Sequence, residues 1–225
     1  MAAMSDLPIK FDANGLVPVV VHDDLTGEIR MVAFATEAAV RATIETGRAT
    51  FFSRSRGELW EKGRTSGNAI VVRRVLVDCD GDCLIYSSEP QGPSCHTGAA
   101  SCFFQVLEGE TIRQPSDAEG VAQTILDKLE RTLESRKHAT GQASYTKSLY
   151  DAGAPRIGAK IREEADELAL AVEAETDDRV VSEAADVLYH VLVGLRWRSI
   201  PLRRVLAELA RRVGTSGHRE KAARG

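Results

Sequence analysis

The spacing of the apolar side chains changes at residues 108–117, and this change constrains the fold more than any other feature. Before it, apolar runs such as Leu16–Val21 and Glu28–Ala35 are short and bounded by turn residues, which is typical of strands. After it, apolar residues recur at every third or fourth position, which is the period of an amphipathic helix. We therefore predict a β-rich α+β domain over residues 1–107, a linker at 108–117, and an all-α domain over residues 118–225.

One helix is expected inside the first domain. Thr36 and Glu37 stand where a helix would begin, with a hydroxyl to cap the first free backbone amides. Gly47 follows the last apolar residue of the segment, and a glycine at that place usually ends a helix. Residues 49–52 then predict another strand.

Three aspartates lie in the turn predicted between two apolar runs, Ile70–Val77 and Cys83–Tyr86. Carboxylate oxygens at this spacing suit magnesium or calcium. A calcium-binding EF-hand loop, with Glu89 as its last ligand, is an alternative on spacing alone. That loop needs Gly where this chain has Cys83, and it needs helices on both sides. The sequence therefore indicates a hard-cation site of another kind, formed by Asp78, Asp80 and Asp82.

Three cysteines in the same region, Cys79, Cys95 and Cys102, offer soft sulfur ligands that select zinc-like ions. Three protein ligands leave one position for water, as catalytic zinc sites do. Disulfides are the alternative. No apolar targeting segment precedes this region, so we expect a reducing cytoplasmic location and prefer metal or buried thiols. Cys83 is predicted to be a small buried residue on a strand.

The polar segment 53–68 carries four positive charges together with hydroxyls and a flexible backbone, a combination that suits a phosphate group. A solvated loop is the alternative. Trp60, inside this segment, is expected to pack against the core. The candidate phosphate ligands are Arg54, Arg56, Lys62, Arg64, Thr65 and Ser66.

The charge balance and the apolar runs exclude two broad classes of partner. The formal net charge is -4 and the isoelectric point is near 5.8, which argues against a general nucleic-acid binder. The longest apolar runs are too short to cross a membrane. We therefore expect small-molecule substrates, with no nucleic acid and no membrane as partner.

These blocks together resemble one family. Ser53–Arg56, Leu59–Gly63, Thr65–Asn68, Asp78–Asp82, Gly92–Gly98 and Ser101–Phe103 are similar, in this order, to the motifs of phosphoribosyl-AMP cyclohydrolase. The resemblance covers about residues 11 to 106. It implies magnesium at Asp78, Asp80 and Asp82, and zinc at Cys79, Cys95 and Cys102. It also implies a homodimer in which the zinc site is shared between chains.

The chemistry implied by this resemblance is hydrolysis of a purine ring. Water activated by zinc would attack C6 of phosphoribosyl-AMP, and the N1–C6 bond would break. Three thiolates donate much charge to zinc, so a nearby proton acceptor would help, and His96 is the candidate base. A structural histidine bonded to the backbone is the alternative. Magnesium, with Arg54, Arg56, Lys62 or Arg64, would bind the substrate phosphates.

The second half shows three apolar stripes of helical period. Ser116 and Glu119 form a possible capping box at its start, and the residues from 214 onward are expected to be disordered. Such short amphipathic helices need a bundle or a dimer partner to bury their stripes. The stripes are Val121, Ile125, Leu129 and Leu133; then Ile157, Ile161, Ala165, Leu168 and Val172; then Val181, Ala184, Leu188, Val191 and Leu195.

Acidic pairs stand beside the second and third stripes. Glu164 and Glu167 share one helix face, with Glu163 adjacent, and Glu183 and Asp186 share another. Packing the two stripes together would bring these carboxylates close, where they would repel one another unless a cation bridged them. We predict magnesium as that bridge. The alternative is ordinary surface acids paired with the neighbouring cations Lys160, Arg162 and Arg179.

This half also resembles a family. Ser144–Thr146, Lys160–Glu167 and Glu183–His190 are similar to motifs of phosphoribosyl-ATP pyrophosphohydrolase, one of the MazG-like all-α pyrophosphohydrolases. The resemblance implies that magnesium bound by Glu164, Glu167, Glu183 and Asp186 neutralises the triphosphate while water attacks between its α and β phosphates. Lys147 and Lys160 would contact phosphates. Arg162 stands where that family usually has Gly.

The two resemblances support each other, because the product of the second reaction is the substrate of the first. They imply a bifunctional enzyme of histidine biosynthesis acting on phosphoribosyl-ATP and then on phosphoribosyl-AMP. One alternative, motivated by Arg162, is an active cyclohydrolase joined to a degenerate helical dimerisation domain. Another is a binding protein in which zinc only stabilises the fold.

Overall fold

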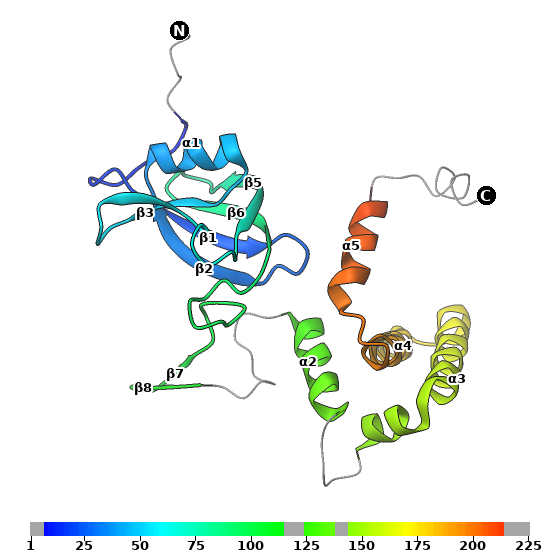
Figure 1. The fold of residues 1–225 in the computed structure, drawn as a ribbon. Coiled ribbons are helices and arrows are strands. Elements are labelled where there is room, and N and C mark those ends of the chain that lie inside the picture. The colour runs from blue at the N-terminus through cyan, green and yellow to red at the C-terminus, as the bar shows by residue number, and fades with distance from the viewer. Residues whose placement is uncertain (1–6, 115–123, 138–143, 214–225) are drawn as a thin grey trace, which may run out of the picture. The chain divides into compact units, whose positions relative to one another are not determined.

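The computed structural model describes residues 7–114, 124–137 and 144–213 (Figure 1). Its contacts divide the chain into two compact units, Met1–Thr124 and Ile125–Gly225. The first is strand-rich and the second is helical, so the predicted order of a β-rich α+β domain and an all-α domain is confirmed. The predicted boundaries of the linker stay a prediction.

Six strands of the first unit form one mixed sheet in the order β4-β3-β2-β1-β6-β5. The pair β1 and β6 is parallel, and every other neighbouring pair in this sheet is antiparallel. In β1, buried residues alternate with half-buried ones, as expected for a strand with one face on the core. The strands are β1 Val17–Asp23, β2 Ile29–Ala35, β3 Thr50–Ser53, β4 Glu58–Glu61, β5 Ile70–Val77 and β6 Leu84–Pro90.

The predicted helix of this unit is α1, Glu37–Thr46, which packs against β2, β3 and β5. Thr36 caps it by accepting a hydrogen bond from the Ala39 amide, and Gly47 ends it in the left-handed conformation at φ 66°. Phe51 and Tyr86 lie fully buried in the core between helix and sheet. The ring of Trp60 packs 5.0 Å from that of Phe51, as the sequence predicted.

Two details of the first unit differ from the sequence-based expectation. Cys83 directly precedes β6 and is half-buried, because it ends the turn and its side chain does not enter the core. A second hairpin, β7 Val106–Glu108 and β8 Thr111–Arg113, occupies part of the segment that was predicted to be a linker. Residues 115–123, which include the predicted capping box, lie outside the described part of the chain.

The second unit contains four described helices, α2 Ile125–Lys137, α3 Tyr145–Ala174, α4 Asp177–Trp197 and α5 Leu202–Arg212. The longest of them, α3, is kinked at Gly153, which has φ 73° and ψ -168°. Pro155 follows two residues later and cannot donate a helical hydrogen bond. The helix therefore consists of a short first part and a longer second part that begins near the kink.

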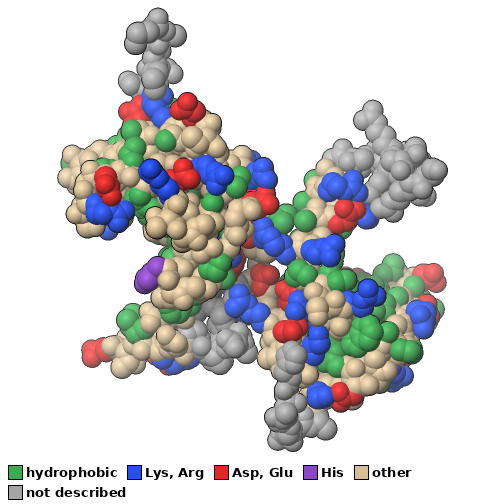
Figure 2. All heavy atoms as spheres, in the orientation of Figure 1, with side chains coloured by type: hydrophobic (Ala, Val, Ile, Leu, Met, Phe, Trp, Pro, Cys, Tyr) green, Lys and Arg blue, Asp and Glu red, His purple; other side chains and the backbone are tan. Residues whose placement is uncertain are grey.

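The buried face of α4 is not the predicted apolar stripe. Within one chain, Val181 is 69% exposed and Leu188 is 52% exposed, whereas Leu192 and Val193 are buried. The cause is that Glu183 and His190 take part in the inner face, which turns the stripe outward. Figure 2 shows apolar side chains on the surface of the helical unit, and it shows positive and negative side chains interspersed over the face in view.

No described helix combines the length and the apolar character that crossing a bilayer requires. The predicted disordered tail, from 214 onward, lies outside the described residues.

Candidate functional site

The three aspartates of the first unit come together at the turn between β5 and β6. One carboxylate oxygen from each lies within 4.8 Å of the others, and all three side chains are exposed. Asp78 shapes the turn, because its Oδ1 accepts hydrogen bonds from the amides of Gly81 at 2.9 Å and Cys83 at 3.1 Å. The charge of Asp80 raises the pKa of Asp82, as expected where like charges crowd together. This set of oxygen donors fits a hard cation.

Cys95 and Cys102 lie close enough to share a thiol hydrogen bond. Burial acts to raise the pKa of Cys95, but hydrogen bonds from Thr97 and from Cys102 outweigh it and the pKa is lowered overall. The Thr97 hydroxyl donates to Cys95 Sγ at 3.1 Å. Burial and the nearby charge of Cys95 raise the pKa of Cys102. Cys95 is therefore the thiol of this pair that ionises first.

Cys79 does not join the other two cysteines within one chain. Among the described residues, two groups of three metal-ligating side chains lie within 4.8 Å, and neither contains a cysteine. Cys79 is exposed on the turn, with its Sγ 4.0 Å from Asp80 Oδ1. The cause is that Cys79 belongs to the β5–β6 turn, whereas Cys95 and Cys102 belong to a separate loop.

His96, the predicted base, is exposed next to this pair. Its Nδ1 lies 3.9 Å from Cys95 Sγ. A proton acceptor at this position is near the sulfur of Cys95 and open to solvent, which suits exchange of a proton with substrate.

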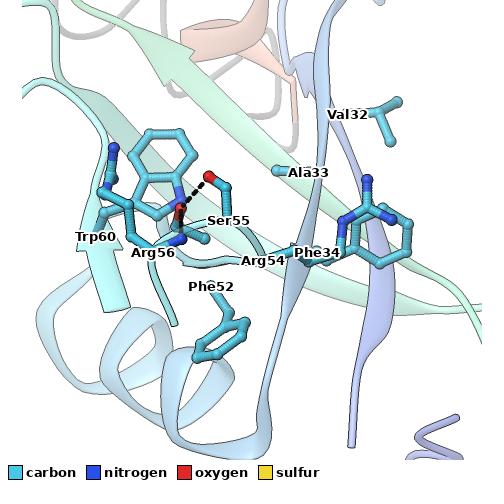
Figure 3. Close-up of a pocket in the computed structure, with 9 residues that line it drawn as sticks. Val32, Ala33, Phe34, Phe52, Arg54, Ser55, Arg56 and Trp60 are labelled. Carbon is cyan, nitrogen blue, oxygen red and sulfur yellow. Dashed lines mark hydrogen bonds between the residues drawn. The ribbon is translucent and has the colours of Figure 1, made fainter. Parts of the chain in front are cut away.

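A pocket of about 500 Å³ opens beside β2, β3 and β4 (Figure 3). The Arg54 guanidinium lies 4.1 Å from the centre of the Phe34 ring, a cation–π arrangement. Arg56 Nε is 2.7 Å from Glu58 Oε1 in an exposed ion pair. The lining residues are Val32, Ala33, Phe34, Phe52, Ser53, Arg54, Ser55, Arg56 and Trp60.

Only two of the predicted phosphate ligands in this domain, Arg54 and Arg56, line the pocket. The charge of Lys62 acts on Cys102 instead and partly opposes the rise in the pKa of that thiol, which places this lysine near the cysteines. The other three, Arg64, Thr65 and Ser66, are exposed in the turn after β4. Gly63 makes that turn possible, because a Cβ there would lie 2.3 Å from the Ala69 amide nitrogen.

The helical unit gathers its carboxylates from two helices. Oxygens of Glu164 and Glu167 from α3 and of Glu183 from α4 lie within 4.8 Å of one another. Glu164 is 6% exposed and Glu183 is 3% exposed, whereas Glu167 faces solvent. Burial raises the pKa of Glu183, the charge of Arg179 opposes this, and the charge of Glu167 adds to it. The group is thus a negatively charged, partly buried site of the kind that a divalent cation would stabilise.

Two cations of the chain already contact this group. Lys160 Nζ lies 2.6 Å from Glu164 Oε1 and 2.9 Å from Glu163 Oε1. Hydrogen bonds to Glu164 and then to Glu163 raise the pKa of Lys160, so the ammonium stays charged. Arg179 Nη2 lies 2.7 Å from Glu183 Oε1. The ion pairs expected in the surface-acid alternative therefore form, but they form around buried glutamates.

The remaining predicted residues of this site have different places. Asp186 lies outside the group of three, although its charge contributes to the raised pKa of Glu183. Lys147 Nζ lies 2.5 Å from Asp151 Oδ1, on the first part of α3. Arg162 is exposed on an uninterrupted stretch of α3, so replacing Gly at this position does not break the helix.

A histidine lies beside these carboxylates, and no role was predicted for it from the sequence. His190 is buried; its Nδ1 contacts the Asp186 carbonyl oxygen at 2.9 Å and its Nε2 contacts the Tyr145 hydroxyl at 2.9 Å. With Nδ1–H donating to the carbonyl, Nε2 is left to accept from the tyrosine hydroxyl. The histidine itself is visible in the sequence, but the period of the apolar residues does not show that its position lies on the buried face of α4.

Two family models match the chain, one for each unit. A model described as phosphoribosyl-AMP cyclohydrolase matches residues 31–104. A model described as phosphoribosyl-ATP pyrophosphohydrolase matches residues 126–213. The first match includes the aspartates, the cysteines and the pocket, and the second includes the glutamate group.

Curated relatives match both units at once, and each of three carries the name histidine biosynthesis bifunctional protein HisIE. The relative from Caldanaerobacter subterraneus subsp. tengcongensis is 39% identical over 204 residues, which cover 91% of this chain and 96% of the relative. The relative from Thermus thermophilus is 43% identical over 188 residues, covering 83% and 84%. The relative from Pyrococcus furiosus is 42% identical over 200 residues, covering 88% and 92%.

Proposed function

The chain belongs to the family of bifunctional histidine-biosynthesis proteins, and from this premise we propose how its two units divide two consecutive hydrolyses. The helical unit converts phosphoribosyl-ATP and water to phosphoribosyl-AMP and pyrophosphate. The strand-rich unit then adds water to C6 of phosphoribosyl-AMP, and the N1–C6 bond breaks. The observation that carries this proposal is that each unit has its own cluster of metal-ligating side chains inside its own family match.

In the helical unit, the chemistry of the donor set fits magnesium, because three carboxylates converge in a partly buried site. Glu164, Glu167 and Glu183 would bind it, and Asp186, whose charge acts on Glu183, would be the fourth ligand. When bound, magnesium would neutralise phosphate charge. Glu163 keeps Lys160 beside the group through their ion pair. Lys160 and Lys147 would turn from their carboxylates to phosphates of the substrate.

In the strand-rich unit, the donor set is of two kinds. The aspartates at 78, 80 and 82 fit magnesium, and the thiols of Cys95 and Cys102 fit zinc. When bound, zinc would supply a water nucleophile that ionises near neutral pH. His96 would accept the proton released as the new C6–O bond forms. The proton needed by the departing N1 would then come from the same imidazole.

The substrate phosphates of this second reaction are assigned to Arg54 and Arg56. Arg54 lines a pocket of about 500 Å³, within the range of volumes of small-molecule sites. Its stacking on Phe34 keeps the guanidinium at the wall and leaves its edge for oxygen ligands.

We place the third zinc ligand, Cys79, on a second copy of the chain. Support comes from the separation of Cys79 from the other two thiols within one chain. A homodimer would bring the turn of one copy to the cysteine loop of the other.

A cytoplasmic location likewise stays a prediction.

The first experiment supplies phosphoribosyl-ATP to the purified full chain with zinc and magnesium and follows pyrophosphate and the ring-opened product separately. We expect both from the natural chain. Glu164→Gln should lose pyrophosphate release and still open added phosphoribosyl-AMP, and Cys102→Ser should do the reverse. Failure to release pyrophosphate, with intact ring opening, would instead support the degenerate dimerisation domain suggested by Arg162.

A further inference from the structure

An ion pair between two residues that have no role in the proposed function is buried where β2 begins, beside the cysteine loop. Arg30 Nη1 lies 2.5 Å from Glu28 Oε2, and both side chains are 9% exposed. The other two nitrogens of the guanidinium leave this strand: Nε donates to Ser94 Oγ at 3.1 Å, and Nη2 donates to the Gly92 carbonyl at 3.0 Å. Arg30 therefore binds the segment that leads into Cys95.

The backbone of Arg30 and of its neighbour Ile29 binds the other end of the cysteine loop. The Arg30 carbonyl accepts from the Cys102 amide at 2.9 Å. The Ile29 carbonyl accepts from Ser101 Oγ at 2.6 Å. One short piece of β2 thus contacts the residue before Cys95, the residue before Cys102, and Cys102 itself.

Between these attachments the loop is narrow. The amides of Ser94 and Cys95 donate to the carbonyls of Ala100 and Ala99, each at 3.1 Å. A displacement of Ser94 would therefore move Cys95 and the returning arm of the loop together. The attachment at Ser94 and Gly92 holds the Cys95 arm of the loop to Arg30, and the attachments at Ser101 and Cys102 hold the returning arm to β2.

This pair is a poor way to stabilise a fold. Burying two charges costs desolvation free energy, which the burial of an apolar pair of the same volume does not, and only good geometry with further hydrogen bonds compensates for this cost. Here Glu28 Oε1 is buried with no hydrogen-bond partner in the described part of the chain. What the pair does provide is geometry, because a planar guanidinium with two anchored edges fixes the direction of its third.

We infer that Arg30, oriented by Glu28, is a positioning residue that sets Cys95 relative to Cys102 for metal binding. The inference rests on the proposed function, in which these two thiols bind zinc. It adds a role outside the cysteine motifs. The side chain that holds the two sulfur ligands at their relative positions comes from β2, far from the cysteines in the sequence.

The test compares three full-length variants with the natural chain. Arg30→Met removes the guanidinium and leaves Glu28 buried alone. Glu28→Leu combined with Arg30→Met removes both charges, and Arg41→Met removes a half-buried arginine of α1, ion-paired with Glu37, as a matched control. Zinc affinity is measured by competition with a chelator, and Co²⁺ is used as a probe because its thiolate absorption reports ligand geometry. Thermal unfolding and pyrophosphate release are followed in the same samples.

We expect Arg30→Met to lower the Tm, whereas the double variant should regain most of that loss, because no charge is left buried and unpaired. Both should bind zinc about 10–100-fold more weakly than the natural chain, the size expected when support around a ligand is removed. Both should also show an altered Co²⁺ spectrum. Pyrophosphate release should be unchanged in all three, and Arg41→Met should behave as the natural chain.

A double variant that is stable and binds zinc with natural affinity would overturn the inference, because the pair would then serve the fold alone. The proposed function fails in a different way. If Cys95→Ser keeps its zinc, the thiols are not the ligands, whatever Arg30 does.

Discussion

The two carboxylate groups of this chain have the same chemistry but are built differently. Asp78, Asp80 and Asp82 come from one turn, and all are exposed. The glutamates of the helical unit come from two helices, and two of the three are buried. A turn brings ligands together by local backbone geometry, whereas packed helices bring them together by tertiary structure. The first group should therefore bind a cation weakly until substrate adds ligands, and the second should be organised before the metal arrives.

The substitution with the largest expected effect on activity replaces one buried glutamate. Glu164→Gln takes away a ligand and leaves Lys160 with one carboxylate partner fewer. We expect pyrophosphate release to fall by about a hundredfold or more, since several kcal/mol of charge stabilisation at a phosphoryl group depend on the cation. Steady-state assays of pyrophosphate measure it. Glu173→Gln, an exposed acid on the same helix, should keep natural activity; a similar loss there would contradict the assignment.

The matching change in the turn should cost less. Asp80→Asn removes one of three exposed negative charges and leaves a neutral amide oxygen, which binds the cation more weakly, so ring opening should fall about tenfold and recover at high magnesium. Titration of activity with magnesium would check this. Pyrophosphate release from the same sample is the control, because its ligands lie in the other unit. A loss that magnesium does not restore would argue for a role beyond metal binding.

Two Gly→Ala substitutions, one in the turn and one in a helix, test the difference through the free energy of unfolding. Gly81 has φ +83° in the turn, so Gly81→Ala should destabilise the first unit by about 1 kcal/mol. Gly158 lies inside α3, where a Cβ would meet Arg162 Nη1 at an ordinary 3.7 Å, so Gly158→Ala should stabilise the helix by up to about 1 kcal/mol. Denaturant unfolding of both variants measures the opposite signs. If both substitutions change the free energy of unfolding in the same direction, local backbone preference does not govern stability at one of the two positions.

The smallest effect is a pH dependence specific to the helical site. Burial first, and then neighbouring acids, raise the pKa of Glu183 above its ordinary value of 4.5. A raised carboxyl pKa means that the folded state binds the proton more tightly, so this residue costs stability as pH rises from 4.5 through its folded pKa. In metal-free protein, Glu183→Gln should remove that part of the slope of Tm against pH. An unchanged slope would show that Arg179 fully compensates the burial.

The parts of the molecule that local sequence determines could be predicted. Thr36 and Gly47 mark both ends of α1, and the Asp80-Gly81 pair marks the turn that carries the carboxylates. By contrast, β4 lies in a segment too polar to be recognised, because it pairs with β3 near the surface. Its presence depends on backbone pairing and on the single packed ring of Trp60.

The parts that depend on packing could not. Periodicity predicted Leu188 on the buried face of α4, yet the buried face includes His190 and Glu183. The helix directs its metal-ligating side chain inward, and apolar residues such as Leu188 are exposed to solvent. Likewise, the sequence placed Cys79 in the predicted turn and indicated three cysteine ligands, but the spacing alone does not show that Cys79 stays apart from the other two within one chain. Arg30 reads in the sequence as one charge in a strand, and only its three hydrogen-bonded neighbours distinguish it.

The two ion pairs of the helical site have one more consequence. Because Lys160 and Arg179 already neutralise Glu164 and Glu183, uptake of a divalent cation there is an exchange of positive charges rather than an addition. Displaced from its carboxylates, Lys160 would become available to the phosphates of the substrate, the role proposed for it above. Occupancy of the site by metal and affinity for the anionic substrate would then rise together, and scarcity of the metal would leave Lys160 paired with the protein's own acids.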